Sequence, residues 1–122
     1  MDAMSAESIT AQPDIELLPI PDAAQRTGLD VLAVEQLVKD GALVLVRDDA
    51  GRRCVPAQFL VAGGPVKHLP AVITLLRDGG FSDVEIVTWL YREDLTLPGS
   101  PIVALRENRG TEVKRRAQAS AL

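Results

Sequence analysis

The residue types that most often carry out catalysis are few and scattered in this sequence. It holds one cysteine, Cys54, and one histidine, His68, which stand 14 positions apart. A cysteine nucleophile needs a neighbouring base, so we expect Cys54 to be a buried structural thiol and His68 to lie on the surface. The acidic residues follow no metal-binding spacing, and the glycine pairs lack a phosphate-loop pattern. The sequence therefore predicts a protein that is not an enzyme and has no catalytic residues, no metal site and no cofactor.

Basic and amide side chains point to a different chemistry, the binding of double-stranded DNA. Arginine and lysine pair with phosphates, glutamine can read adenine, and lysine can reach guanine. Three arginines flank a predicted tight turn, while a glutamine and a lysine lie on the outer side of a predicted helix. The candidate DNA-contacting residues are Arg26, Gln36, Lys39, Arg47, Arg52, Arg53 and Lys67. Glu35, on the same helix, could accept a hydrogen bond from a cytosine amine. The alternative for each helix residue is an ordinary solvated face.

Two of these arginines are adjacent in a predicted strand, which limits what they can do together. Neighbouring side chains on a strand face opposite sides, so Arg52 and Arg53 are not expected to face the same side of the hairpin. We expect one of them to meet phosphate or the minor groove and the other to be structural.

The charge of the chain argues against general binding to polyanions. The 13 basic and 17 acidic residues give a net charge of −4. The first 20 residues hold four acids and no base, whereas residues 21–68 hold six of each and residues 69–122 seven of each. The excess charge therefore lies at the N-terminus, and local basic patches on a neutral body are compatible with weak, strongly salt-dependent DNA binding.

The elements that would position these residues follow a helix, turn, helix and hairpin order. A helix is predicted over 21–28, where a proline opens it and Gly28 closes it. Asp30 is a good N-cap for a helix over 31–39, in which Val31, Val34, Leu37 and Val38 form one apolar stripe. Strands are predicted over 42–47 and 52–56, around a turn at Asp48–Gly51. This order is typical of a winged helix-turn-helix.

The second half of the chain is predicted to be helical. A helical turn follows at 56–61, and Gly63–Pro65 is expected to be a break. Helix signals then appear at four places, among them Ser82 with Glu85 at capping-box spacing and Ser100 followed by a proline. The predicted fold is mainly α with a small β-hairpin, an N-terminal winged helix-turn-helix followed by a C-terminal helical bundle. The expected divisions are a disordered tail at 1–14, the winged helix-turn-helix at 15–62 and the helical domain at 63–122.

The N-terminus and the hydropathy pattern indicate a cytoplasmic protein. Residues 1–13 lack the basic and apolar regions of a signal peptide. No apolar run approaches the roughly 18 residues that a membrane span needs, and a lone cysteine suits a reducing compartment.

Several stretches of the sequence resemble known protein families and extend these expectations. The stretch PDAAQRTGLDVLAVEQLVKDGALVLVRDDAGRRCVPAQFL resembles excisionase-like and MerR-like winged helices. Together with VKHLPAVITLLRDGGFSDVEIVTWLYRED and EVKRRAQASAL, it resembles the small actinobacterial winged-helix DNA-binding proteins known as substrates of the serine/threonine kinase PknL. This resemblance implies a transcription regulator with a C-terminal helical domain of unassigned role. It also implies a phosphoprotein in which a serine/threonine kinase modifies a threonine of the N-terminal tail and weakens DNA binding. Thr10 is the tail's only threonine.

A second resemblance concerns the C-terminal half. Trp89-Leu90, Leu97-Pro98-Gly99-Ser100-Pro101 and Leu105 follow a pattern similar to the toxin-binding domain of antitoxins of the Xre/MbcA/ParS type. The alternative function is therefore an antitoxin-like or other protein-binding module that contacts a protein partner through Trp89–Pro101. A third possibility is a winged helix used for protein contacts alone, because its second helix is partly acidic.

Overall fold

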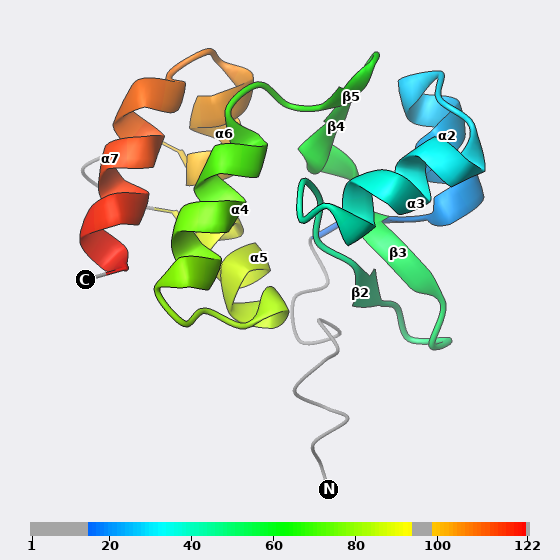
Figure 1. The fold of residues 1–122 in the computed structure, drawn as a ribbon, viewed down its shortest axis with the longest axis horizontal. Helices are drawn as coiled ribbons and strands as arrows, with labels where there is room; N and C mark the ends of the chain where they lie inside the picture. The colour runs from blue at the N-terminus through cyan, green and yellow to red at the C-terminus, as the bar shows by residue number, and fades with distance from the viewer. Residues whose placement is uncertain (1–14, 94–98, 122) are drawn as a thin grey trace, which may run out of the picture.

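Two short helices near the start of the described chain form a helix-turn-helix. The computed structural model, which describes residues 15–93 and 99–121, places helix α2 at Ile20–Thr27 and helix α3 at Val31–Lys39 (Figure 1). Helix α2 ends where Gly28 adopts a left-handed conformation with φ 79°, and α3 begins where the Asp30 side chain accepts a hydrogen bond from the Ala33 N–H at 2.8 Å. Both predicted helices are confirmed, the first beginning one residue earlier than expected.

A three-stranded antiparallel sheet joins a strand that precedes the helices to the predicted hairpin that follows them. Strands β1 (Leu17–Pro19), β3 (Arg53–Pro56) and β2 (Val46–Arg47) lie in the order β1-β3-β2, with Arg47 opposite Arg53. The predicted strand over 42–47 is wrong for its first four residues. Leu43 and Val44 are both fully buried, whereas successive side chains of a strand point to opposite faces. These residues instead enter the core as irregular chain.

A second, smaller hairpin replaces the break expected at Gly63–Pro65. After the 3-10 turn η1 (Ala57–Phe59), strands β4 (Leu60–Val61) and β5 (Gly64–Pro65) pair antiparallel. The Gly63 N–H donates to the Thr27 carbonyl at 2.8 Å. The prediction of a break is therefore wrong, because contacts with the end of α2 hold these glycines in a hairpin.

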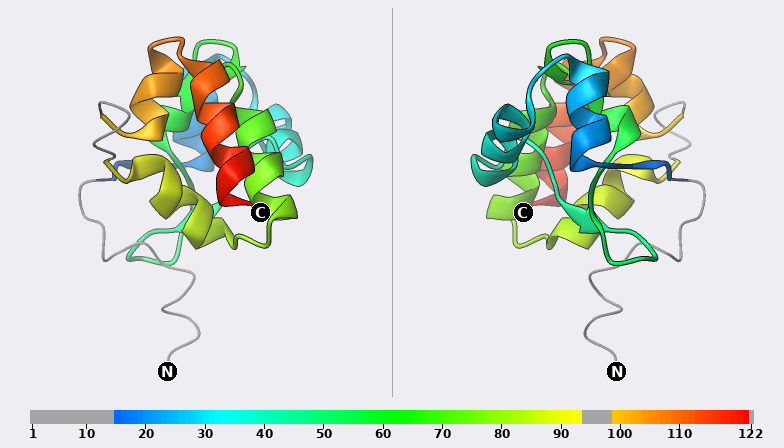
Figure 2. Two further views of the ribbon diagram at one scale, coloured as in Figure 1. Left: turned by 90° about the vertical axis from the view of Figure 1, so that its left-hand side faces the viewer. Right: turned by 90° about the vertical axis from the view of Figure 1, so that its right-hand side faces the viewer.

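The C-terminal half is helical, as expected. It contains α4 (Leu69–Asp78), α5 (Asp83–Tyr91), α6 (Pro101–Arg106) and α7 (Gly110–Ser120). Ser82 and Glu85 form the predicted capping box, and Ser100 caps α6. Helix α4 lies between α7 and the winged helix, and Figure 2 shows α4 and α7 side by side. No helix within the described residues is long and apolar enough to cross a membrane.

The two halves share one hydrophobic core. Val34 and Phe59 from the first half and Ile73 and Leu90 from the second are fully buried in the same cluster. The Phe59 and Tyr91 rings stack with centroids 6.1 Å apart. The Arg106 guanidinium donates to the Gln58 and Leu60 carbonyls at 2.9 and 3.1 Å. The C-terminal helices therefore hold the winged helix in one defined position.

Candidate nucleic-acid interface

The outward face of α3 carries an exposed row of three different side chains. Leu32, Gln36 and Lys39 stand at positions i, i+4 and i+7, which share one face of a helix, and all three are exposed. Val34 faces the opposite way and is fully buried. The prediction that Val31 belongs to the buried stripe is wrong, because 42% of Val31 is exposed. Sequence reasoning also missed Leu32, since a leucine next to an apolar stripe gives no signal of its 80% exposure.

The two polar members of this row, Gln36 and Lys39, are exposed in the second half of α3. The Gln36 side-chain amide donates to the Asp40 carboxylate at 2.8 Å. To bind Gln36, a base edge would have to replace Asp40 as its hydrogen-bond partner. This exchange is possible because the hydrogen bond is exposed. Lys39 lies in the last turn of α3, where a cation also complements the helix dipole.

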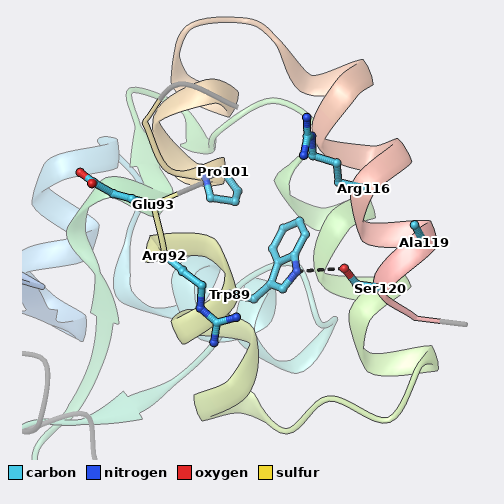
Figure 3. Close-up of a pocket in the computed structure, with 7 residues that line it drawn as sticks. All are labelled: Trp89, Arg92, Glu93, Pro101, Arg116, Ala119 and Ser120. Carbon is cyan, nitrogen blue, oxygen red and sulfur yellow. Dashed lines mark hydrogen bonds between the residues drawn. The ribbon is translucent and has the colours of Figure 1, made fainter. Parts of the chain in front are cut away.

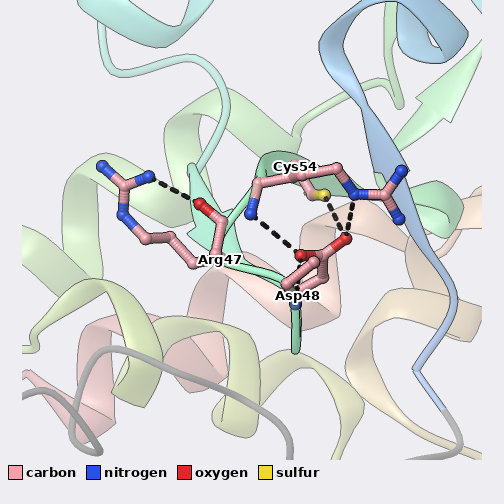
Figure 4. Close-up of polar contacts among 6 residues, drawn as sticks. Arg47, Asp48 and Cys54 are labelled. Carbon is pink, nitrogen blue, oxygen red and sulfur yellow. Dashed lines mark hydrogen bonds and ion pairs between the residues drawn. The ribbon is translucent and has the colours of Figure 1, made fainter.

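The tip of the β2–β3 hairpin is organised by Asp48. One oxygen of its carboxylate accepts from the backbone N–H groups of Ala50 and Arg52, each at 2.9 Å. The other oxygen accepts from Arg52 Nε at 2.7 Å and lies 3.7 Å from the buried Cys54 sulfur (Figure 4). The hydrogen bonds from Arg52 lower the pKa of Asp48. Burial and the nearby Asp48 carboxylate raise the pKa of Cys54, which is the buried thiol that was expected.

Two of the predicted arginines remain accessible at this hairpin. Arg47 donates to the Gly51 carbonyl at 3.0 Å from an exposed position. Arg52 stays 64% exposed although it pairs with Asp48. Both guanidiniums are thus pre-positioned by the turn and still open to an anion.

Arg53 forms an ion pair with another side chain of the protein. Its two terminal nitrogens donate to the two carboxylate oxygens of Glu35 at 2.9 and 2.8 Å. These hydrogen bonds lower the pKa of Glu35 and raise the pKa of Arg53, so the pair stays charged near neutral pH. The contact ties strand β3 to helix α3. Glu35, which the sequence offered as a cytosine reader, is occupied by Arg53.

The last two predicted cations lie apart from the hairpin. Arg26 is exposed in the last turn of α2. Lys67 is exposed in the segment between β5 and α4, which lies at the top of Figure 1 while the β2–β3 turn lies at the bottom. Partial burial and the charges of Lys114 and Lys67 lower the pKa of His68, whose ring packs against Gly110 at the start of α7. Lys67 therefore belongs to the junction with α7 and not to the hairpin.

The region that resembles an antitoxin surface forms a hollow of about 530 Å³. The Trp89 indole N–H donates to the Ser120 hydroxyl at 3.1 Å, and Arg92, Pro101 and Arg116 also line the space (Figure 3). Residues 94–98 of the segment Trp89–Pro101 lie outside the described residues, as does Thr10.

Comparison with known proteins gives a consistent result over both halves. A family model described as the wHTH domain of the DNA-binding protein Rv2175c matches residues 6–60, and one described as the Rv2175c C-terminal domain of unknown function matches residues 66–121. The curated DNA-binding protein Rv2175c of Mycobacterium tuberculosis is 38% identical in an alignment 122 positions long, which covers 89% of this chain and 83% of the relative. The NMR structure of Rv2175c superimposes with a TM-score of 0.79 at 36% identity, covering 91% of this chain and 84% of that one.

Proposed function

Because the chain belongs to the Rv2175c family, with its winged helix-turn-helix and C-terminal domain, we propose that it binds double-stranded DNA and regulates transcription at the sites it occupies. The observation that carries this proposal is the junction of α3 with the β2–β3 hairpin. The Glu35–Arg53 ion pair holds the two elements together. Their exposed side chains, Gln36 and Lys39 on the helix and Arg47 and Arg52 on the hairpin, are of the types that contact bases and phosphates.

Each element has a distinct role in this proposal. Helix α3 enters the major groove, where Gln36 exchanges its contact with Asp40 for an adenine edge. Lys39, Arg47, Arg52 and Arg26 contact phosphates. Four such contacts give a slope of log K against log salt of about −3.6, so binding weakens steeply as salt rises.

Titration of a labelled duplex at low and moderate salt tests the proposal. We expect binding at low salt that weakens strongly at higher salt. The variant Arg47→Ala/Arg52→Ala should flatten the slope by about 1.8. The matched control Arg92→Ala/Arg115→Ala removes two exposed arginines from α5–α7 and should leave the slope unchanged. Absence of duplex binding at low salt, or equal effects of the two double variants, would refute the proposal.

We further propose that a serine/threonine kinase modulates this binding by phosphorylating Thr10. The first 20 residues already hold four acids and no base, and a phosphate adds nearly two more negative charges. Added negative charge opposes association with DNA phosphates. The test compares DNA affinity before and after phosphorylation, with Thr10→Ala as the control. Equal affinities of phosphorylated and unmodified protein would exclude the switch.

A second candidate function is association with a protein partner at the Trp89 hollow. The observation that favours it is an aromatic ring beside two arginines on the surface of the C-terminal helices. Co-expression with the proteins encoded by neighbouring genes tests it. A complex that survives purification and is lost on Trp89→Ala supports this function, whereas a complex that Trp89→Ala leaves intact places the contact elsewhere.

A further inference from the structure

Leucine and valine at the start of α3 are exposed where a soluble protein usually places polar residues. Among the described residues the large hydrophobic side chains left exposed are Val31, Leu32 and Val61, at 42%, 80% and 37%. Two of the three are neighbours in the first turn of α3. Leu32 also shares the outward face with Gln36 and Lys39, so an apolar group lies in line with the proposed DNA-contacting residues.

The row is long enough to face more than one base pair. An α-helix rises about 1.5 Å per residue, so Leu32 precedes Gln36 by about 6 Å and Lys39 by about 10 Å along the axis. Base pairs are stacked about 3.4 Å apart. Along the DNA axis the row therefore spans at most about three base-pair steps, with Leu32 at most about two steps from Gln36.

The major groove offers one apolar group for such a side chain, the 5-methyl of thymine. The N-terminal part of the second helix is the part that approaches base edges in a helix-turn-helix. Leu32 has no charge and no hydrogen-bonding group, so phosphate or a polar base edge would gain nothing from it. We propose that Leu32, with Val31 beside it, reads a thymine methyl within about two base pairs of the base that Gln36 contacts. This inference rests on the proposed DNA binding and adds a sequence preference to it.

The experiment removes the methyl group from the DNA and the side chain from the protein. Preferred duplexes are first selected from a random pool by the wild-type protein. Each thymine of the selected site is then replaced by deoxyuridine, which lacks only the methyl. Affinities are measured for wild type, Leu32→Ala and the control Val61→Ala, which shortens another exposed valine on strand β4. Because Leu32 is so exposed, its replacement is expected to leave the thermal unfolding transition unchanged.

We expect deoxyuridine at one position to weaken wild-type and Val61→Ala binding about fourfold, the change for one buried methyl group. The same replacement should have no effect on the affinity of Leu32→Ala, which already lacks the side chain that contacts the methyl group. The inference is overturned if no thymine methyl contributes, or if Leu32→Ala keeps the methyl dependence. It is also overturned if Leu32→Ala dissociates a dimer in sedimentation, since Leu32 then contacts a second copy of the chain. A wild-type protein that binds no duplex refutes the proposed function and this inference together, whereas duplex binding without methyl dependence refutes this inference alone.

Discussion

Replacing Glu35 with glutamine removes the charge that holds Arg53 and keeps a side chain of nearly the same size. In the wild-type protein both terminal nitrogens of Arg53 are bound to the Glu35 carboxylate, and the Arg53 side chain remains 45% exposed. Arg53 therefore stands beside α3 with its charge neutralised. In Glu35→Gln we expect Arg53 to be released and to contact a DNA phosphate.

The size of the effect follows from counterion release. One additional phosphate contact makes the slope of log K against log salt steeper by about 0.9. Between about 200 and about 50 mM salt, a fourfold change, the affinity of the variant relative to wild type should then rise about 3.5-fold. Fluorescence anisotropy with a labelled duplex at several salt concentrations measures both slopes.

Two further variants separate this explanation from a general change in charge. Glu112→Gln removes the carboxylate of another ion pair, the one with Arg116 in α7, and changes the net charge equally. We expect Glu112→Gln to show the wild-type slope. In Glu35→Gln/Arg53→Gln the slope should return to the wild-type value, because the released cation is gone. If Glu35→Gln has the wild-type slope, or binds more weakly at every salt concentration, the ion pair serves to orient α3 and the reasoning is wrong.

Three other predictions concern the shared core and its contacts. Burial raises the pKa of Tyr91, the chain's only tyrosine, to about 12, so the change in tyrosine absorbance on ionisation should occur near that pH. Since the pKa of an unfolded tyrosine is about 10, the free energy of unfolding should fall on the order of 2 kcal/mol between pH 10 and 12. The Tyr91→Phe variant should not show this fall. In Gly110→Ala the new methyl would overlap the His68 ring, so thermal melting should show a loss of about 1–3 kcal/mol, and unchanged stability would refute the close contact. The Cys54 thiol, fully buried and with a raised pKa, should react with a thiol reagent only after denaturation, and rapid reaction of the native protein would contradict its burial.

The helix boundaries of this protein could be predicted because their causes are local. The Asp30 cap, the Gly28 stop and the capping box at Ser82 and Glu85 each act within one turn of helix. The order of helices and hairpin then predicted the winged helix-turn-helix. The second hairpin at β4–β5 was missed, because its position depends on a hydrogen bond to Thr27, which is remote in the sequence.

The site was predicted as residue types but not as contacts. Sequence reasoning found the hairpin arginines and expected one of Arg52 and Arg53 to be structural. Which one it was depended on Glu35, which stands 18 positions from Arg53 and reaches it only after α3 packs beside β3. In the same way, periodicity placed Val31 inside, whereas α3 is buried at Val34 and leaves Val31, its first residue, 42% exposed.

The sequence by itself determined the elements, their order and the candidate basic residues, because capping, turn formation and hydrophobic periodicity act between near neighbours. The tertiary structure decided which charges are neutralised, which cations remain at the hairpin and that Leu32 is exposed. These properties depend on the burial of one core shared by both halves, for example through the bonds from Arg106 to carbonyls more than 40 positions away. Burial is a property of the whole packed chain, so no local pattern could have supplied it.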